Sequence, residues 1–275
     1  MIKVSPGETP FRISLWSIWI FYTLAILLLL GGLFTDREIG SMIPGPDDME
    51  EVYAALWLTS WTSAWVLALS LLLGLPTAYM LATRQFRGKV LVESIIDVPM
   101  ALPPVVCGVA VLFALSPTSP LGAFVTARGI PVLFHPIGII LVQTFIAAPY
   151  LVRHAREAFA SVPNRYLQAA RVAGASEGRV FFRVCIPLCL RQIGAGALTA
   201  WARAIGEFGA TLLIVGAMPF KTQTMAISLY VNGFMAAKKD VMFFMAFLFV
   251  ILSIAVMALL KLLTSNSRSA HEQEA

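Results

Sequence analysis

Two oppositely charged residues lie four positions apart in an otherwise apolar stretch. Arg203 and Glu207 are the charged members of residues 200–211, where small side chains dominate. Residues four apart share a helix face and can pair, and either ion left alone in a membrane interior costs several kcal/mol. We therefore expect the two side chains to interact, either as a structural ion pair that fixes helix packing or as charges that line a pathway for an ion.

Three prolines interrupt a second apolar stretch. Pro99, Pro103 and Pro104 lie within residues 97–104, and each removes a backbone hydrogen-bond donor from a helix. Backbone groups left unpaired at membrane depth are tolerated only against protein or a water-filled cavity. The pattern predicts either a broken helix that lines a pathway or a kink whose free carbonyls are satisfied by neighbouring helices.

Residue types that carry enzymatic chemistry are scattered along the chain. The three histidines, His135, His154 and His271, form no HExxH pair. The single Gly-Lys pair, Gly88-Lys89, lacks the remaining residues of a phosphate-binding P-loop. The sequence therefore predicts no catalytic residue and no ATPase site in this chain, which argues against a membrane-embedded enzyme.

The three cysteines fall in or beside apolar segments. Cys185 and Cys189 are four residues apart, without histidines that would complete a zinc site. We expect both thiols, and that of Cys107, to be small buried side chains. No metal or other cofactor is predicted for the chain.

The composition is that of a membrane protein. Of 275 residues, 59% are hydrophobic and 13% are charged, whereas a soluble domain carries about 25% charged residues. Apolar runs of about 20 residues are long enough to span the hydrocarbon core as helices. We read six: residues 14–34, 55–83, 91–115, 132–152, 190–216 and 241–263. The first could instead be a signal peptide, but its length and the lack of a small-x-small cleavage site favour a membrane helix.

The basic residues predict the orientation of these helices. With the N-terminus in the cytoplasm, fourteen of the 20 Lys and Arg residues fall on the cytoplasmic side, seven of them between residues 153 and 191. Five fall outside, where the loop at residues 35–52 is acidic. This positive-inside bias predicts a multi-pass protein of the cell membrane with both termini in the cytoplasm, and gives no reason to expect nucleic-acid binding.

The cytoplasmic segment of residues 153–189 contains a short predicted helix. Tyr166, Ala170 and Gly174 recur every four residues, with Ala169 and Ala173 alongside, and such small residues allow another surface to approach closely. The segment could pack on the protein's own helices or on a partner. Pro163 suits the start of this helix, and Pro187 predicts a break before the fifth apolar run.

This segment resembles the EAA loop of ABC importer permeases. Residues 168–170 read Gln-Ala-Ala, Gly174 follows after three residues, and residues 184–187 read Val-Cys-Ile-Pro after nine more. The family has Glu at position 168, so any salt bridge from that position is in doubt. The resemblance implies the all-α fold of type I importers, with a coupling helix that docks on a separate dimer of ABC ATPase subunits, which bind the ATP. The coupling residues would be Gln168, Ala169, Ala170, Gly174, Ala175 and Pro187.

Residues 97–106 and 200–211 are similar to segments of oxyanion permeases. The run Ala-Arg-Ala-Ile-Gly-Glu-Phe-Gly-Ala at residues 202–210 resembles permeases for molybdate, tungstate and sulfate, and molybdate permeases fit best. The resemblance covers roughly residues 55–263. It implies import of a tetrahedral oxyanion delivered by an extracellular or periplasmic binding protein, through a pore between two copies of the chain. The pathway residues would be Pro103, Pro104, Arg203, Gly206, Glu207, Gly209 and Thr211.

The expected organisation has three parts. Residues 1–52 would hold a cytoplasmic tail, the first membrane helix and an outer loop; residues 53–264 would form the transmembrane domain; residues 265–275 would be a cytoplasmic tail. A sulfate or thiosulfate permease is the main alternative. A secondary transporter is a more remote one, because no internal repeat is evident. Whether Arg203 and Glu207 touch the substrate stays open.

Overall fold

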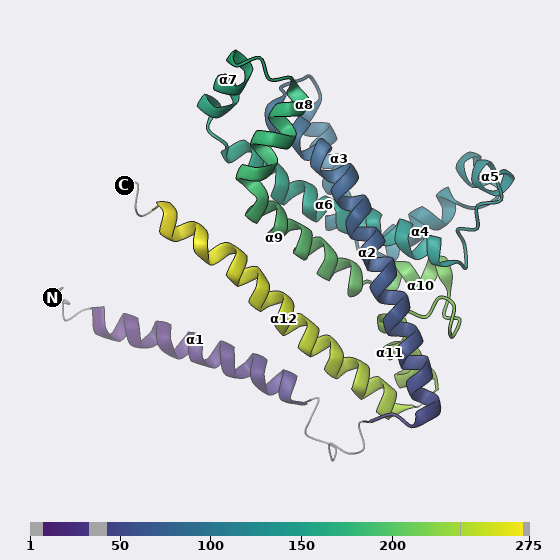
Figure 1. Ribbon diagram of the computed structural model, residues 1–275. Coiled ribbons are helices and arrows are strands. Elements are labelled where there is room, and N and C mark those ends of the chain that lie inside the picture. The colour runs from purple at the N-terminus through teal and green to yellow at the C-terminus, as the bar shows by residue number, and fades with distance from the viewer. Residues whose placement is uncertain (1–7, 33–42, 237, 272–275) are drawn as a thin grey trace.

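Every regular element in the described part of the chain is a helix. The computed structural model describes residues 8–32, 43–236 and 238–271, with side chains between 14 and 263 (Figure 1). The helices in chain order are α1 (Glu8–Gly31), α2 (Pro46–Thr83), α3 (Lys89–Ala101), α4 (Pro104–Ala114), α5 (Pro120–Ala127), α6 (Pro136–Ser161), α7 (Asn164–Val172), α8 (Glu177–Val180), η3 (Phe181–Cys185), α9 (Ile186–Ile205), α10 (Gly209–Val215), α11 (Met225–Tyr230), η4 (Val231–Met235) and α12 (Lys239–His271).

The predicted membrane architecture is confirmed. Within the described residues, five helices are long and apolar enough to cross a membrane, and α3 with α4 makes a sixth if that bent pair is one span. The five are α1, α2, α6, the helix of residues 177–205, and α12. The termini at 1–7 and 272–275 lie outside the described residues, as do residues 35–42 of the predicted outer loop.

Two of the predicted spans are interrupted. The run at 91–115 is divided between α3 and α4, which are bent by 113°, as the prolines predicted, because Pro103 and Pro104 cannot donate to the preceding turn. The run at 190–216 ends as a helix at Ile205 and resumes as α10 at Gly209. The outer loop is also shorter than predicted, since α2 begins at Pro46, a favourable first residue for a helix.

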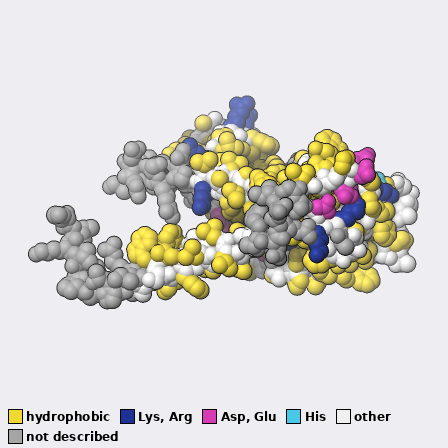
Figure 2. Space-filling view, turned by 90° about the horizontal axis from the view of Figure 1, so that it is seen from below, with side chains coloured by type: hydrophobic (Ala, Val, Ile, Leu, Met, Phe, Trp, Pro, Cys, Tyr) yellow, Lys and Arg dark blue, Asp and Glu magenta, His cyan; other side chains and the backbone are white. Residues whose placement is uncertain are grey.

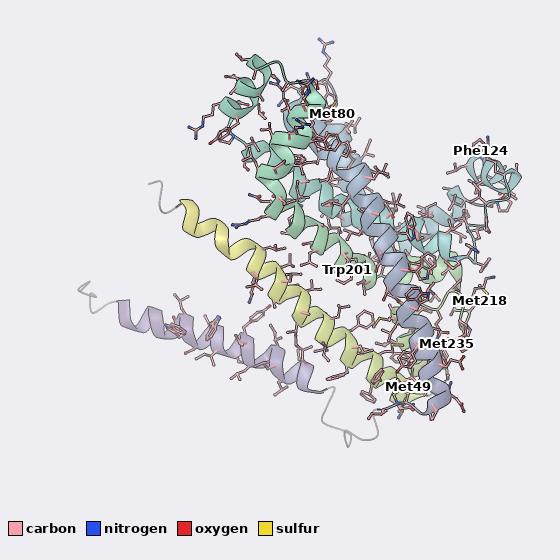
Figure 3. The ribbon with its side chains drawn as sticks, viewed as in Figure 1. Met49, Met80, Phe124, Trp201, Met218 and Met235 are labelled. Atoms are coloured by element: carbon pink, nitrogen blue, oxygen red, sulfur yellow. The ribbon has the colours of Figure 1, made fainter. Side chains whose placement is uncertain are left out.

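The centre of the bundle is formed by α2, α6 and α9, which cross closely (Figure 1). A Cβ on Gly196 of α9 would lie 2.6 Å from the Cβ of His154 on α6, so only glycine allows this approach. Ser63 of α2 is buried and accepts a hydrogen bond of 3.1 Å from the indole of Trp201, which Figure 3 labels on α9. Small residues therefore set the spacing of the central helices, and a few polar contacts fix their register.

The surface of the bundle is largely apolar. Figure 2 shows hydrophobic side chains over much of the described face, with charged side chains gathered in a few places. None of the residues of the apolar stretch Ser14–Gly31 in α1 is buried, and in α12 only 11% of the residues of an apolar 18-residue stretch are buried. Such faces suit contact with lipid or another membrane helix.

A polar cluster fixes the first turns of α2 to segments from the other end of the chain. The Glu51 carboxylate accepts hydrogen bonds from Gln223 Nε2 at 2.8 Å and from Asn232 Nδ2 at 2.9 Å. Lys238 Nζ donates to Asp48 Oδ1 at 2.7 Å, and this hydrogen bond is the main cause of a raised Lys238 pKa. Asp48 and Glu51, which were predicted to lie in a loop, thus belong to a helix and hold the residue before α12 beside it.

Candidate functional site

Two helix breaks lie against each other inside the bundle. A Cβ on Gly209, the first residue of α10, would lie 3.0 Å from Val105 Cγ2 in the first turn of α4. A Cβ on Gly108 of α4 would lie 2.7 Å from the Cα of Ala210. The first turn of α4, which begins at the predicted pathway residue Pro104, therefore lies against the predicted pathway residue Gly209, although the two are about a hundred positions apart in the chain.

We expect Gly108→Ala to destabilise this crossing. The added methyl group would overlap the backbone of Ala210, which cannot rotate away, and overpacking of this kind costs about 1–3 kcal/mol. The thermal midpoint of the detergent-purified protein should fall. Gly194→Ala in α9 is the matched control, because its nearest neighbour would be Leu263 Cδ1 at 3.8 Å. Equal midpoints for the two variants would show that α4 and α10 can separate freely.

The predicted contact between Arg203 and Glu207 is present. Arg203 Nη1 lies 2.6 Å from Glu207 Oε2, and the Glu207 side chain is 1% exposed, against 25% for Arg203. Glu207 Oε1 accepts a hydrogen bond from the Ala210 backbone N–H at 3.0 Å. The carboxylate thus joins the end of α9 to the first turn of α10, a geometry that a structural ion pair explains without any ligand.

Thr211 has a buried partner that sequence reasoning missed. Gln143 Nε2 of α6 donates to Thr211 Oγ1 at 3.4 Å, and both side chains are buried. The other amide atom of Gln143, Oε1, is buried without a hydrogen-bond partner. A glutamine in an apolar run is itself a signal of a functional or packing role, and it could have been singled out on that ground.

The predicted pathway residues do not form one continuous set. Gly206 lines a cavity of about 120 Å³ between α9 and α12, together with Phe249, Leu252 and Val256. Pro103 and Pro104 are exposed on the single chain. The predicted set therefore divides between the junction of α4 with α10, the Arg203–Glu207 pair and the groove beside α12. A role of these residues in conduction stays a prediction.

The predicted loop helix forms as α7 and protrudes at one end of the bundle (Figure 1). It starts directly after Pro163, as predicted. Its two sides differ: Leu167 is buried, and Ala170 packs beside it against the core, whereas Gln168 and Ala169 are exposed. The predicted stripe of small residues is thus divided between an inner and an outer face.

Gly174 and Pro187 have local structural roles, and their part in coupling stays a prediction. Gly174 has a φ of +77°, so it turns the chain after α7 in a conformation that other residues rarely adopt. Ala175 follows and packs inward. The predicted break at Pro187 is wrong: the helix continues from Glu177 to Ile205. The π turn of η3, where Ile186 N–H bonds to Phe181 O, accommodates the missing donor of the proline.

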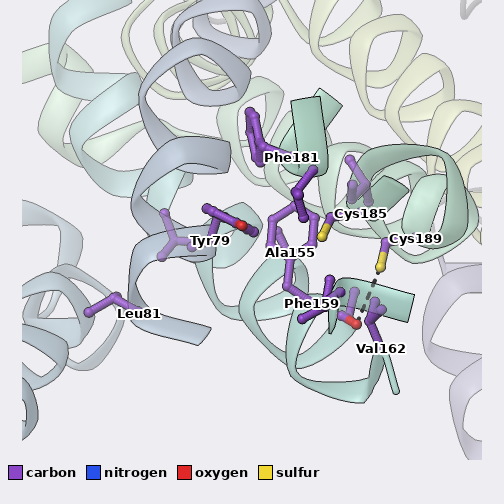
Figure 4. Close-up of a cluster of buried hydrophobic side chains, with 14 residues drawn as sticks. Tyr79, Leu81, Ala155, Phe159, Val162, Phe181, Cys185 and Cys189 are labelled. Carbon is purple, nitrogen blue, oxygen red and sulfur yellow. Dashed lines mark hydrogen bonds between the residues drawn. The ribbon is translucent and has the colours of Figure 1, made fainter. Parts of the chain in front are cut away.

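The three cysteines are buried and free, as predicted. Cys189 Sγ donates to the Ala158 carbonyl at 3.3 Å within the apolar cluster shown in Figure 4. Among the described residues, no three His, Cys, Asp or Glu side chains gather in a way that could hold a metal ion.

Comparison with known proteins identifies relatives of this chain. The model of the family described as binding-protein-dependent transport system inner membrane component matches residues 70–269. The molybdate/tungstate transport system permease protein WtpB of Pyrococcus furiosus is 34% identical over 202 residues, which cover 74% of each chain. The molybdenum transport system permease protein ModB of Escherichia coli is 35% identical over 179 residues, 65% of this chain and 78% of that one.

Solved structures with a similar fold are transporters. One, from a bacterial ABC transporter involved in the import of the acidic polysaccharide alginate, has a TM-score of 0.67 at 15% identity and covers 95% of this chain and 99% of that one. A chain of the methionine ABC transporter MetNI in an inward-facing conformation has a TM-score of 0.60 at 19% identity, covering 80% of this chain and 100% of that one. At these identities the likeness concerns the fold alone.

Proposed function

The chain belongs to the family of binding-protein-dependent transport system inner membrane components, and on that premise we propose that it is the permease subunit of an ATP-driven importer of molybdate or tungstate. The observation that supports molybdate or tungstate as the substrate is the 34% identity, over 74% of both chains, with a permease named for these two ions. Sulfate and thiosulfate are the alternative substrates, and the names of the relatives do not favour them.

The exposed face of α7 supports a separate ATPase as the source of energy. This helix stands out from the bundle, with Ala169 exposed and Leu167 anchored in the core. A rigid helix with a small-residue outer face can fit closely into a groove of a partner. We propose that two ATPase subunits dock on the α7 helices of two copies of this chain, and that a binding protein delivers the oxyanion from outside.

The charge distribution supports an orientation with α7 in the cytoplasm. Seven Arg residues lie between positions 153 and 191, around α7, whereas the opposite end carries Asp47, Asp48 and Glu51 in the first turns of α2. In Figure 1, α1 begins and α12 ends on the side of the bundle where α7 lies. We propose that both termini are cytoplasmic.

The proposed division of the chain keeps the predicted bounds, which fall within α2 (Pro46–Thr83) and α12 (Lys239–His271). Residues 1–52 would contain the peripheral helix α1 and its connections, residues 53–264 the transmembrane domain, and residues 265–275 a cytoplasmic tail. The family match over residues 70–269 supports a transmembrane domain that excludes α1. The exposure of α1 supports the same division.

Uptake into vesicles tests the proposed substrate. The permease would be reconstituted with its cognate ATPase, and the binding protein and radiolabelled tungstate would be supplied on the side opposite ATP. We expect ATP-dependent accumulation of tungstate that excess molybdate suppresses and excess sulfate does not, because selection occurs in the binding protein before the membrane.

Three other outcomes of the uptake experiment would contradict import of molybdate or tungstate by an ATP-driven permease. Accumulation of sulfate that excess molybdate leaves unchanged would indicate that the chain transports sulfate, the alternative substrate, and not molybdate or tungstate. Uptake of only a sugar or an amino acid would contradict oxyanion transport. Uptake that follows an ion gradient, without ATP or a copurifying ATPase, would indicate a secondary transporter.

A further inference from the structure

One carboxylate joins the loop helix to the central bundle. Glu177 Oε1 accepts a hydrogen bond from Arg171 Nε at 3.1 Å. Glu177 Oε2 accepts one from the Tyr79 hydroxyl at 3.1 Å and lies 3.7 Å from Arg84 Nη2. The four residues come from the last turn of α7, the start of α8, the last turns of α2 and the residue that follows α2. Each oxygen of Glu177 therefore faces a different part of the fold.

The contact on the α2 side rests on a rigid support. The ring of Tyr79 packs against Phe159 of α6, with centroids 5.8 Å apart, and against Phe181 of η3 at 5.0 Å (Figure 4). The Tyr79 residue is 7% exposed, and only its hydroxyl reaches the edge of the cluster toward Glu177. Glu177 is thus bonded to a packed cluster with members from α2, α6 and η3.

The α7 side of the contact is more exposed and less closely packed than the α2 side. Leu167 is buried, but most of α7 is exposed, and Val172 at its end is 90% exposed. Gly174 then turns the chain sharply before α8. Arg171 lies in the last turn of α7, so its bond to Glu177 joins this turn to the start of the helix that continues to Ile205.

We propose that Glu177 is a positioning residue for energy coupling, which carries movement of α7 to the end of α2 by holding Arg171 on one oxygen and Tyr79 with Arg84 on the other. This inference rests on the proposed function, because it assigns α7 to an ATPase that moves it. A purely stabilising role fits the geometry less well. The Glu177 side chain is 46% exposed, and exposed ion pairs add little to folding stability.

The test compares Glu177→Gln with the unmodified complex of permease and ATPase. The amide keeps the size of the side chain but removes the charge that Arg171 and Arg84 face. We expect an unchanged thermal midpoint and full retention of the ATPase, with a fall of about fivefold in tungstate imported per ATP hydrolysed, the lower end of typical coupling between sites. Glu157→Gln is the matched control, because Glu157 pairs with Arg153 within α6 alone, at 3.6 Å.

A charge exchange separates positioning from general damage. Arg171→Glu and Glu177→Arg should each uncouple transport, and the double variant should recover part of the ratio of import to hydrolysis. A normal ratio in Glu177→Gln, or a fall matched by a lower thermal midpoint, would overturn the positioning role while leaving the proposed function intact. No ATP-dependent import by the unmodified complex would instead overturn the proposed function, and this inference with it.

Discussion

Ala169→Trp is expected to abolish import by removing the ATPase from the complex. Ala169 lies on the exposed side of α7, opposite the buried Leu167, so an indole there would project toward the proposed ATPase partner without disturbing the bundle. It would hold two complementary surfaces apart, and dispersion contacts are lost within about 1 Å of added separation. The purified variant should keep its thermal midpoint and lose the copurifying ATPase, and vesicles should show no ATP-dependent uptake.

Two controls sharpen this experiment. Arg179→Lys keeps the charge at an exposed position of α8 and should leave association and uptake nearly unchanged. Gly174→Trp also adds an indole, but its φ of +77° means that the variant would distort the turn after α7 as well. Normal association and normal uptake in Ala169→Trp would show that the exposed face of α7 is not the docking surface.

Arg203→Ala should cause the largest loss of stability of any single change proposed for this chain. It leaves the Glu207 carboxylate, which is 1% exposed, without its cation. Breaking a buried ion pair by removing one partner costs about 3–5 kcal/mol, and the membrane interior offers no water in compensation. The thermal midpoint in detergent should fall strongly, and the fall should be smaller when Glu207→Ala is added.

The double-mutant cycle and one isosteric variant separate the two bonds of Glu207. The interaction between the side chains equals the departure of the double variant from the sum of the single ones. Glu207→Gln can still accept from the Ala210 N–H through its amide oxygen while losing the ion pair, so it should retain the turn into α10 and lose only part of the stability. Strictly additive losses would contradict a coupled pair.

Some features follow from the sequence because they depend on neighbours along the chain. An apolar run of about 20 residues must form a helix in a membrane, since its backbone groups have no other partners there. The pairing of Arg203 with Glu207 follows from their spacing of four. The start of α7 after Pro163 and the bend at Pro103 and Pro104 follow from the missing donor of proline.

Other features were decided only by the tertiary structure, because they join residues far apart in the chain. Helix packing brings Gly108 against Ala210, and Tyr79 against Glu177 across 98 positions of the chain. The pattern of neighbouring residues in the sequence does not predict these contacts. Packing also decides that Ala170 faces the core while Ala169 faces outward. The helix through Pro187 survives because a π turn absorbs the missing donor. The sequence by itself determined which segments form apolar helices long enough to cross a membrane. The fold determined which of their side chains meet, since burial of one helix face depends on the shape of its neighbours.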